Sequence, residues 1–210
     1  DDKNLVHLGR LPHPDNLAVS WGKKLSTLLK MAFFCDAESA SSNDRIIRTT
    51  KEWITNYTQD YSNLFVVIGW RTWERGEWLI DDVYYQINAS GTDIVPDSHN
   101  EKYKEYVIGV NWRHKTNQAH KDVIALHEWL EEKDIKHVFF NGNNTFSQIN
   151  TKYDFGSAYI EPYNKGFSYN DHLLANGSHT VSPNSYHFGE DGHTTWSKYL
   201  LKYIVKNNLI

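Results

Sequence analysis

Short apolar runs alternate along the chain with longer stretches in which hydrophobic residues recur at helical spacing. Four runs rich in Val, Phe and Ile have the composition of buried parallel strands, and they lie at 4–8, 32–38, 64–70 and 137–142. Four amphipathic stretches, at 18–31, 42–57, 101–134 and 189–208, predict helices, the third of them long or broken. We therefore expect strands and helices to alternate from the start of the chain.

Alternating strands and helices predict a parallel sheet with helices on both faces, and right-handed crossovers make it doubly wound. The expected fold is therefore α/β, a three-layer α/β/α, flavodoxin-like arrangement in one domain of 210 residues. Such sheets bind ligands at the carboxyl ends of their strands. The segment 143–185 is rich in Asn, Gly and Ser, and we interpret it as an irregular, mobile flap.

Composition and charge exclude several classes of function. The net charge of −4 provides no basic field, so we expect no nucleic-acid partner. Cys35 is the one cysteine, which excludes internal disulfides and a cysteine-built zinc site. The 11 histidines show no H-x-H or HExxH pattern, so we expect no metal and no cofactor. Eight of them are interpreted as scattered surface residues: His7, His13, His114, His120, His127, His137, His172 and His179. Without a signal peptide or a long apolar run, we expect no membrane association and a cytoplasmic location, in the host cell if the protein is viral.

Three blocks of the sequence carry a resemblance to a known family. They are AESASSNDRIIRTT (37–50), VVIGWRTWERGEW (66–78) and SPNSYHFGEDGHTTWSKYL (182–200). In order and spacing they resemble the SGNH/GDSL hydrolase superfamily, especially its phage-encoded branch. The resemblance implies an esterase-type site: a nucleophilic Ser after the first strand, a His base before the last helix, an orienting Asp, and Gly and Asn donors to the oxyanion.

The resemblance maps onto this chain with substitutions. His187 matches the base, and its place before the last helix suits that role. Asn184 stands three residues before it, where an Asp would orient the imidazole. The oxyanion Gly falls on Ala40, and the oxyanion Asn falls near Arg71.

The nucleophile is the open question of this site. After Gly9 the chain reads Arg10 and Leu11, with no hydroxyl. Three alternatives remain: a different alignment of this loop, a nucleophile from the next loop, or no serine mechanism, and we favour the last. The candidate hydroxyls of the next loop are Ser39, Ser41 and Ser42.

Further residues are placed around the predicted pocket. If Arg10 and Arg71 both point towards His187, the pocket would be cationic and suited to a carboxylate or phosphate. Trp70 and Trp73 could stack on a sugar or nucleobase, although at least one of them is expected in the core. The remaining members of the candidate substrate pocket are Asn43 and Gly69.

Some residues have plainer interpretations. Ser42, Asn43 and Asp44 are possible caps of the helix at 42–57, and capping is the first interpretation of Asn43 and Asp44. His193 shares an apolar helical stripe and is interpreted as a core-facing, hydrogen-bonded histidine, with a Glu190–His193 catalytic pair as the less favoured alternative.

Two functions follow from these observations. The first is an SGNH-like hydrolase acting on an ester, with a carbohydrate O-acyl group as the favoured substrate. The second is an inactive SGNH-fold binding or structural protein of a phage that recognises an anionic or glycan ligand through Arg10, Arg71 and His187. The expected partner is a small-molecule or glycan ester, and a homo-oligomer or a virion partner is left open.

Overall fold

Three parallel strands form the central sheet of this computed structural model, which describes residues 12–57, 60–89, 95–183 and 185–210. The strands are β1 (Phe65–Trp70), β4 (Lys136–Asn141) and β5 (Tyr159–Ile160), in the order β1-β4-β5. The predicted strands at 64–70 and 137–142 are therefore confirmed. The predicted strand at 4–8 lies outside the described residues.

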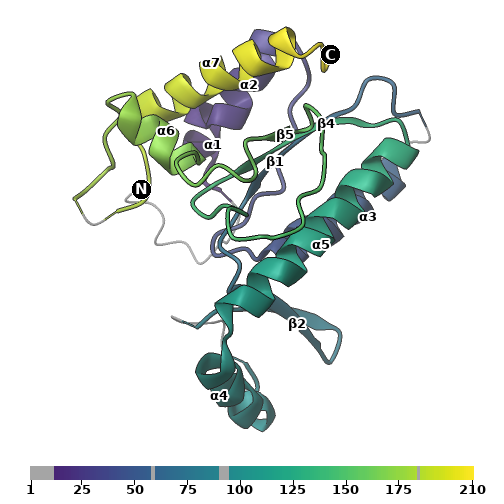
Figure 1. The fold of residues 1–210 in the computed structure, drawn as a ribbon, viewed down its shortest axis with the longest axis vertical. Helices are drawn as coiled ribbons and strands as arrows, with labels where there is room; N and C mark the ends of the chain where they lie inside the picture. The colour runs from purple at the N-terminus through teal and green to yellow at the C-terminus, as the bar shows by residue number, and fades with distance from the viewer. Residues whose placement is uncertain (1–11, 58–59, 90–94, 184) are drawn as a thin grey trace.

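Helices pack on both faces of this sheet (Figure 1). On one face lie α2 (Trp21–Leu29), α6 (Tyr169–Ala175) and α7 (Glu190–Lys206), and on the other lie α3 (Asn43–Tyr57) and α5 (Trp112–Glu132). The prediction of a mixed α/β fold with a parallel sheet is confirmed at this level. None of the helices in these described ranges is both long and apolar enough to span a membrane.

The core consists of two clusters because successive strand side chains point to opposite faces. Phe139 and Tyr159 pack with the helices α3 and α5. Val138, Phe140 and Ile160 pack with α2, α6 and α7. A strand covered on both faces favours apolar side chains at successive positions, which is why β4 carries the run Val138–Phe140 at its centre.

The helix boundaries follow side-chain caps. The predicted helix at 18–31 is divided into α1 (Pro14–Val19) and α2, because the Ser20 hydroxyl accepts from the Lys23 N–H at 3.2 Å and starts a new helix. The predicted long or broken helix at 101–134 is indeed broken, into α4 (Asn100–Gly109) and α5.

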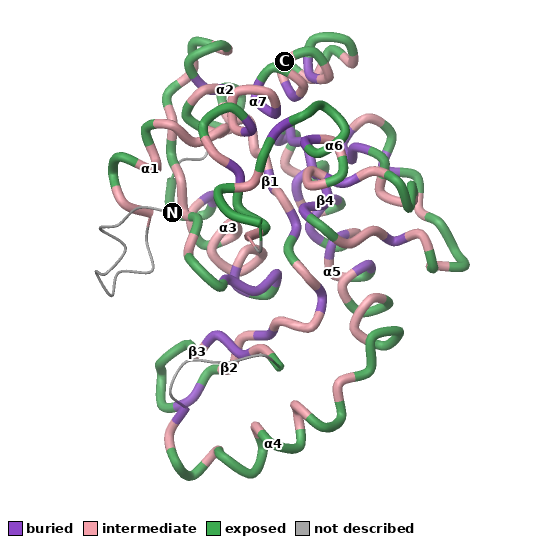
Figure 2. Tube along the Cα trace, turned by 90° about the vertical axis from the view of Figure 1, so that its left-hand side faces the viewer, coloured by how far each residue is buried: buried purple, intermediate pink, exposed green. Residues whose placement is uncertain are grey.

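A hairpin that the hydrophobic pattern does not predict follows β1. Its strands β2 (Gly76–Ile80) and β3 (Val83–Ile87) pair antiparallel across Asp81 and Asp82, whose φ angles of 49° and 61° are both left-handed. This is the backbone of a two-residue I′ turn, usually signalled by Asn-Gly or Asp-Gly. The hairpin, the 3₁₀ turn η1 (Asp97–His99) and α4 extend away from the sheet, and α4 buries no residue (Figures 1 and 2).

Two expectations about the chain are wrong. Residues 32–38 form no strand; Phe34 is 57% exposed and stacks on the ring of Trp53 at 4.6 Å, so this apolar run packs against a helix surface instead of a strand. The segment 143–185 is not a flap, because it contributes β5, α6 and the fully buried Phe146 to the core. Its aromatic residues are separated by polar turns, which conceals them from a search for periodicity.

Candidate functional site

The carboxyl ends of β1 and β4 meet at one edge of the sheet. The Gly142 N–H donates to the Trp70 carbonyl at 2.9 Å. Beside them, Asn43 clamps the backbone of Arg71: its Oδ1 accepts from the Arg71 N–H at 2.9 Å, and its amide donates to the Arg71 carbonyl at 3.1 Å. The start of α3 and the ends of both strands are therefore tied together.

Asn43 is thus a positioning residue for Arg71, and of the three possible caps it is Ser42 that takes the role. The Ser42 hydroxyl accepts from the Arg45 N–H at 3.2 Å and caps α3. Asp44 accepts instead from the Glu77 N–H at 3.1 Å, which links α3 to β2.

Gly142 and α6 complete this edge of the sheet. A Cβ at Gly142 would lie 2.8 Å from the Trp70 carbonyl oxygen and 4.0 Å from Nη1 of Arg71, so the Arg71 guanidinium lies beside the end of β4. The Asn170 N–H donates to the Gly142 carbonyl at 3.1 Å, which brings the start of α6 and Tyr169 to the same place.

His187 lies in the loop between α6 and α7. The loop is closed by a bond from the Val181 N–H to the His187 carbonyl at 2.9 Å, and the His187 N–H donates to the Ser185 hydroxyl at 3.0 Å. Desolvation, and then the nearby charges of Arg71 and Arg75, lower the pKa of His187. The imidazole is therefore neutral at pH 7, and both arginines lie within its electrostatic reach.

Neither Arg71 nor Arg75 forms an ion pair with a residue that the structure describes. Arg75 donates to the Ser41 carbonyl at 3.3 Å, and its buried Nε has no hydrogen-bond partner among those residues. Desolvation and then the charge of Arg75 lower the pKa of Arg71. Burial raises the pKa of Tyr169 to about 12, although the charge of Arg71 acts in the opposite direction. The arrangement can bind an anion by forked N–H donors.

The candidate hydroxyls differ in accessibility. Ser42 is fully buried and caps α3, and Ser41 is buried with its hydroxyl directed to the Ser42 carbonyl at 3.4 Å. Ser39 is exposed. Across the described ranges no hydroxyl is hydrogen-bonded to the imidazole of His187, so a preformed Ser–His pair is not seen there. Arg10 and Asn184 lie outside the described residues.

The aromatic members of the predicted pocket are core residues. Trp70 is fully buried, and Trp73 is buried and stacks on Phe146 at 4.6 Å. The expectation that one of them packs in the core is confirmed, and the proposed stacking on a sugar is wrong for both. Gly69 allows close packing: a Cβ there would lie 2.6 Å from the ring of Phe140.

Ala40, the candidate oxyanion residue, has a backbone conformation that favours glycine. Its φ of 61° is left-handed, a conformation that a residue with a Cβ rarely adopts. The residue is exposed, in the turn before α3.

The interpretation of His193 as a core-facing, hydrogen-bonded histidine is confirmed. The residue is half-buried, and its Nδ1 accepts from the Trp21 N–H at 3.3 Å, which bonds α7 to the first turn of α2. The Glu190 carboxylate forms an ion pair with Lys24 at 2.7 Å, so it is already engaged with a residue outside the alternative Glu190–His193 pair.

The interpretation of the histidines as scattered surface residues is wrong for three of them. His120, His127 and His137 are all buried. His120 bonds to the hydroxyl of Tyr163 at 2.8 Å, and burial lowers its pKa. Their burial depends on packing between α5, β4 and the segment after β4, which no local pattern signals.

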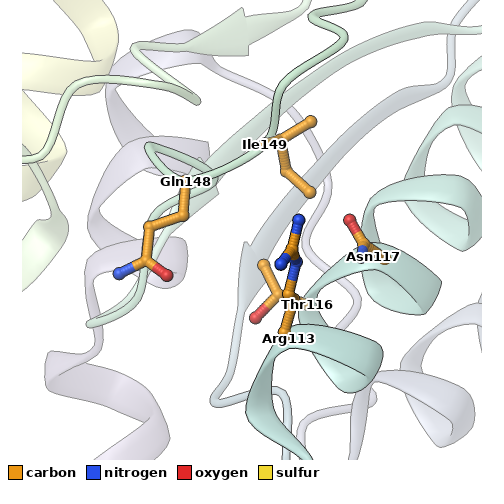
Figure 3. Close-up of a pocket in the computed structure, with 5 residues that line it drawn as sticks. All are labelled: Arg113, Thr116, Asn117, Gln148 and Ile149. Carbon is orange, nitrogen blue, oxygen red and sulfur yellow. The ribbon is translucent and has the colours of Figure 1, made fainter.

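Two small cavities lie near the amino-terminal part of α5. The larger, about 170 Å³, is lined by Arg113, Thr116 and Asn117 of α5 and by Gln148 and Ile149 of the loop after β4 (Figure 3). The smaller, about 40 Å³, is lined in part by Asn43 and Arg75. The second can hold only a few water molecules.

Sequence reasoning missed three residues of this edge. Arg75 lies within a block quoted for the resemblance, four residues after Arg71, and its charge was the available signal. Tyr169 follows Ser168, which caps α6 by accepting from the Asp171 N–H at 3.1 Å, an S-x-x-D pattern that marks a helix start. Gly142 closes the strand run at 137–142.

Comparison with known proteins gives one match. The model of a family of unknown function (DUF6071) matches residues 13–161, more than half of the chain. The chain belongs to the DUF6071 family. The match to DUF6071 spans α1 to β5 and includes Arg71, Arg75 and Gly142, whereas His187 lies beyond it. No curated protein and no solved structure matches the chain.

Proposed function

We propose that this domain binds an anionic small molecule or glycan, carrying a carboxylate or phosphate, at the carboxyl ends of β1 and β4. The observation that carries the proposal is the pair Arg71 and Arg75. They lie close enough for the charge of Arg75 to lower the pKa of Arg71, and neither forms an ion pair with a described residue. Two adjacent positive charges repel each other, and a bound anion relieves that repulsion. His187 is the third contact and, being neutral, donates or accepts one hydrogen bond.

The fold that we propose for this function is the doubly wound, flavodoxin-like sheet of the SGNH superfamily. Two observations support it: β1 and β4 are parallel neighbours joined by a connection that contains α5, and helices cover both faces. In such folds the carboxyl ends of the strands form the ligand site. The glycine-like backbone at Ala40 and the position of His187 agree with this assignment.

The test is calorimetric titration of the protein with inorganic phosphate, acetate and a uronic acid at low and high salt. Arg71→Gln should weaken binding by about 10-fold or more, because a hydrogen bond to a charged group is worth about 1.5–3 kcal/mol. The matched control is Arg113→Gln, which removes the same charge from the cavity of Figure 3. Equal affinities for the protein and Arg71→Gln, or a loss confined to Arg113→Gln, would refute the proposal.

Ester hydrolysis is the second candidate function, and the lowered pKa of His187 favours it. A neutral imidazole is the form that acts as general base. Of the three candidate serines, Ser39 is the exposed one. Turnover of p-nitrophenyl esters that is lost in both His187→Ala and Ser39→Ala, but kept in Ser182→Ala, would support a hydrolase. Turnover unchanged in His187→Ala would exclude this site as its source.

A further inference from the structure

Two buried histidines face each other at the opposite end of β4. His127 of α5 and His137 of β4 approach with Nδ1 of His127 2.8 Å from Nε2 of His137. Glu131 stands one helical turn after His127, and its Oε1 lies 3.9 Å from Nδ1 of His137. One ligand atom from each of the three residues lies within 4.8 Å of the others.

The backbone fixes which nitrogen of His137 can bind a ligand. Its Nδ1 lies 2.9 Å from the Ile135 carbonyl, which can only accept, so Nδ1 carries the proton. The Nε2 lone pair is therefore directed at His127. A histidine that donates its other ring N–H to a backbone carbonyl is the usual arrangement of a metal-ligating histidine.

The surroundings favour the neutral, metal-binding form of both rings. Desolvation is the main cause that lowers the pKa of His127 and of His137. Glu131 and Glu128 oppose this effect at His127, and the Ile135 carbonyl and Glu131 oppose it at His137. The charges of His127 and Lys136 lower the pKa of His137 further. The rings of Phe155 and Tyr153 lie 5.2 Å and 5.7 Å from that of His127 and form an apolar wall.

Glu131 gives the cluster access to solvent. Its side chain is 63% exposed, whereas that of His137 is 1% exposed. An ion can therefore enter past the carboxylate. Two imidazole nitrogens and one carboxylate oxygen form a donor set that suits zinc and similar divalent ions, with a fourth position left for water.

We propose that His127, His137 and Glu131 form a binding site for a divalent transition metal of the zinc type. Zinc–nitrogen bonds of about 2.0–2.1 Å in a tetrahedron place two nitrogens about 3.3 Å apart, so the rings must separate by about 0.5 Å. The proton of His127 moves from Nδ1 to Nε2, so metal uptake replaces one N–H···N bond with two metal–nitrogen bonds and releases no proton.

The bound ion would act as a structural link. It would join the carboxyl-terminal turns of α5 to the first residues of β4 across the tight connection 133–135. This end of β4 is about 20 Å from Gly142, since a strand rises about 3.3 Å per residue. The metal site is therefore separate from the proposed anion site, and each can fail without the other.

The experiment uses the tag-free full chain, stripped with chelator and titrated with Zn²⁺ by calorimetry and with Co²⁺ by visible absorption. We expect one ion per chain with a dissociation constant below 10 µM, roughly as three protein ligands give, and a higher melting temperature with Zn²⁺. Glu131→Gln should weaken binding at least 10-fold, whereas its exposed neighbour Glu132→Gln should bind like the unmodified protein.

The Glu131→Gln variant changes an exposed side chain, so it tests the proposal without disturbing the core. His137→Gln adds a second test and should abolish the visible absorption of bound Co²⁺. Three results would overturn the proposal: no binding below about 100 µM Zn²⁺, equal affinities for Glu131→Gln and Glu132→Gln, or binding that survives His137→Gln.

Discussion

Replacing Ala40 with glycine should stabilise the protein, although glycine usually destabilises. Ala40 has a left-handed φ of 61°. That conformation costs an L-residue about 1–2 kcal/mol, whereas the extra unfolded-state entropy of glycine costs about 0.5–1 kcal/mol. Ala40→Gly should therefore raise the free energy of unfolding by about 0.5–1 kcal/mol.

The matched control for this prediction is Ala37→Gly, three residues earlier in the same segment. Ala37 is exposed and does not have a positive φ, so only the entropic cost applies and the variant should lose about 0.5–1 kcal/mol. Urea unfolding followed by tryptophan fluorescence measures both; with a slope of about 2 kcal/mol per M, the midpoints should move by about 0.3–0.5 M in opposite directions. If both variants lose stability equally, the left-handed backbone at Ala40 is not what limits stability there.

Three further changes test the packing. Gly142→Ala places a Cβ 2.8 Å from a backbone oxygen of β1, so urea unfolding should reveal a loss of about 1–3 kcal/mol; an unchanged midpoint would contradict the close approach. Arg48→Met leaves the carboxylate of Glu77, whose side chain is 5% exposed, without its ion pair and should cost about 3 kcal/mol; a double-mutant cycle with Glu77→Gln should show strong coupling. The pKa values of His127 and His137 are lowered from 6.5 in the folded state, so the unfolded chain binds more protons just below that pH. Unfolding free energy measured from pH 7 to 5 should fall as the pH decreases, and His137→Gln should flatten that slope; a flat profile for the unmodified protein would contradict the burial of these rings.

The elements that the sequence predicted best are those whose burial pattern follows directly from the spacing of their own apolar residues. The strand at 137–142 and the helices at 42–57 and 189–208 were predicted within a few residues, because a strand buried on both faces is continuously apolar and an amphipathic helix has its own period. The hairpin around Asp81 and Asp82 was missed since its turn lacks the glycine that marks such turns. Residues 32–38 have a strand's composition, and only their packing made them a loop.

The sequence suggested some members of the candidate site and not others. The hypothesis that Arg71 points towards His187 stays a prediction, and the one observation that agrees with it is that the charge of Arg71 lowers the pKa of His187. Arg75 was not predicted as part of the site, although its positive charge is evident in the sequence. The cap at Ser42 is a local bond that the sequence already allowed, whereas the role of Asn43 as a clamp on Arg71 depends on which loop its side chain reaches.

The sequence by itself determined the α/β class, most of the helices and two strands of the sheet, because each depends on side chains a few positions apart. Tertiary structure alone decided that Trp70 and Trp73 are core residues and that His127 and His137 face each other in the interior. These histidines are ten positions apart in the sequence. They meet because the chain reverses direction after α5, so that α5 packs against β4 and both rings are buried. Whether a residue is buried depends on which distant parts of the chain pack against it, so the local spacing of residues does not determine it.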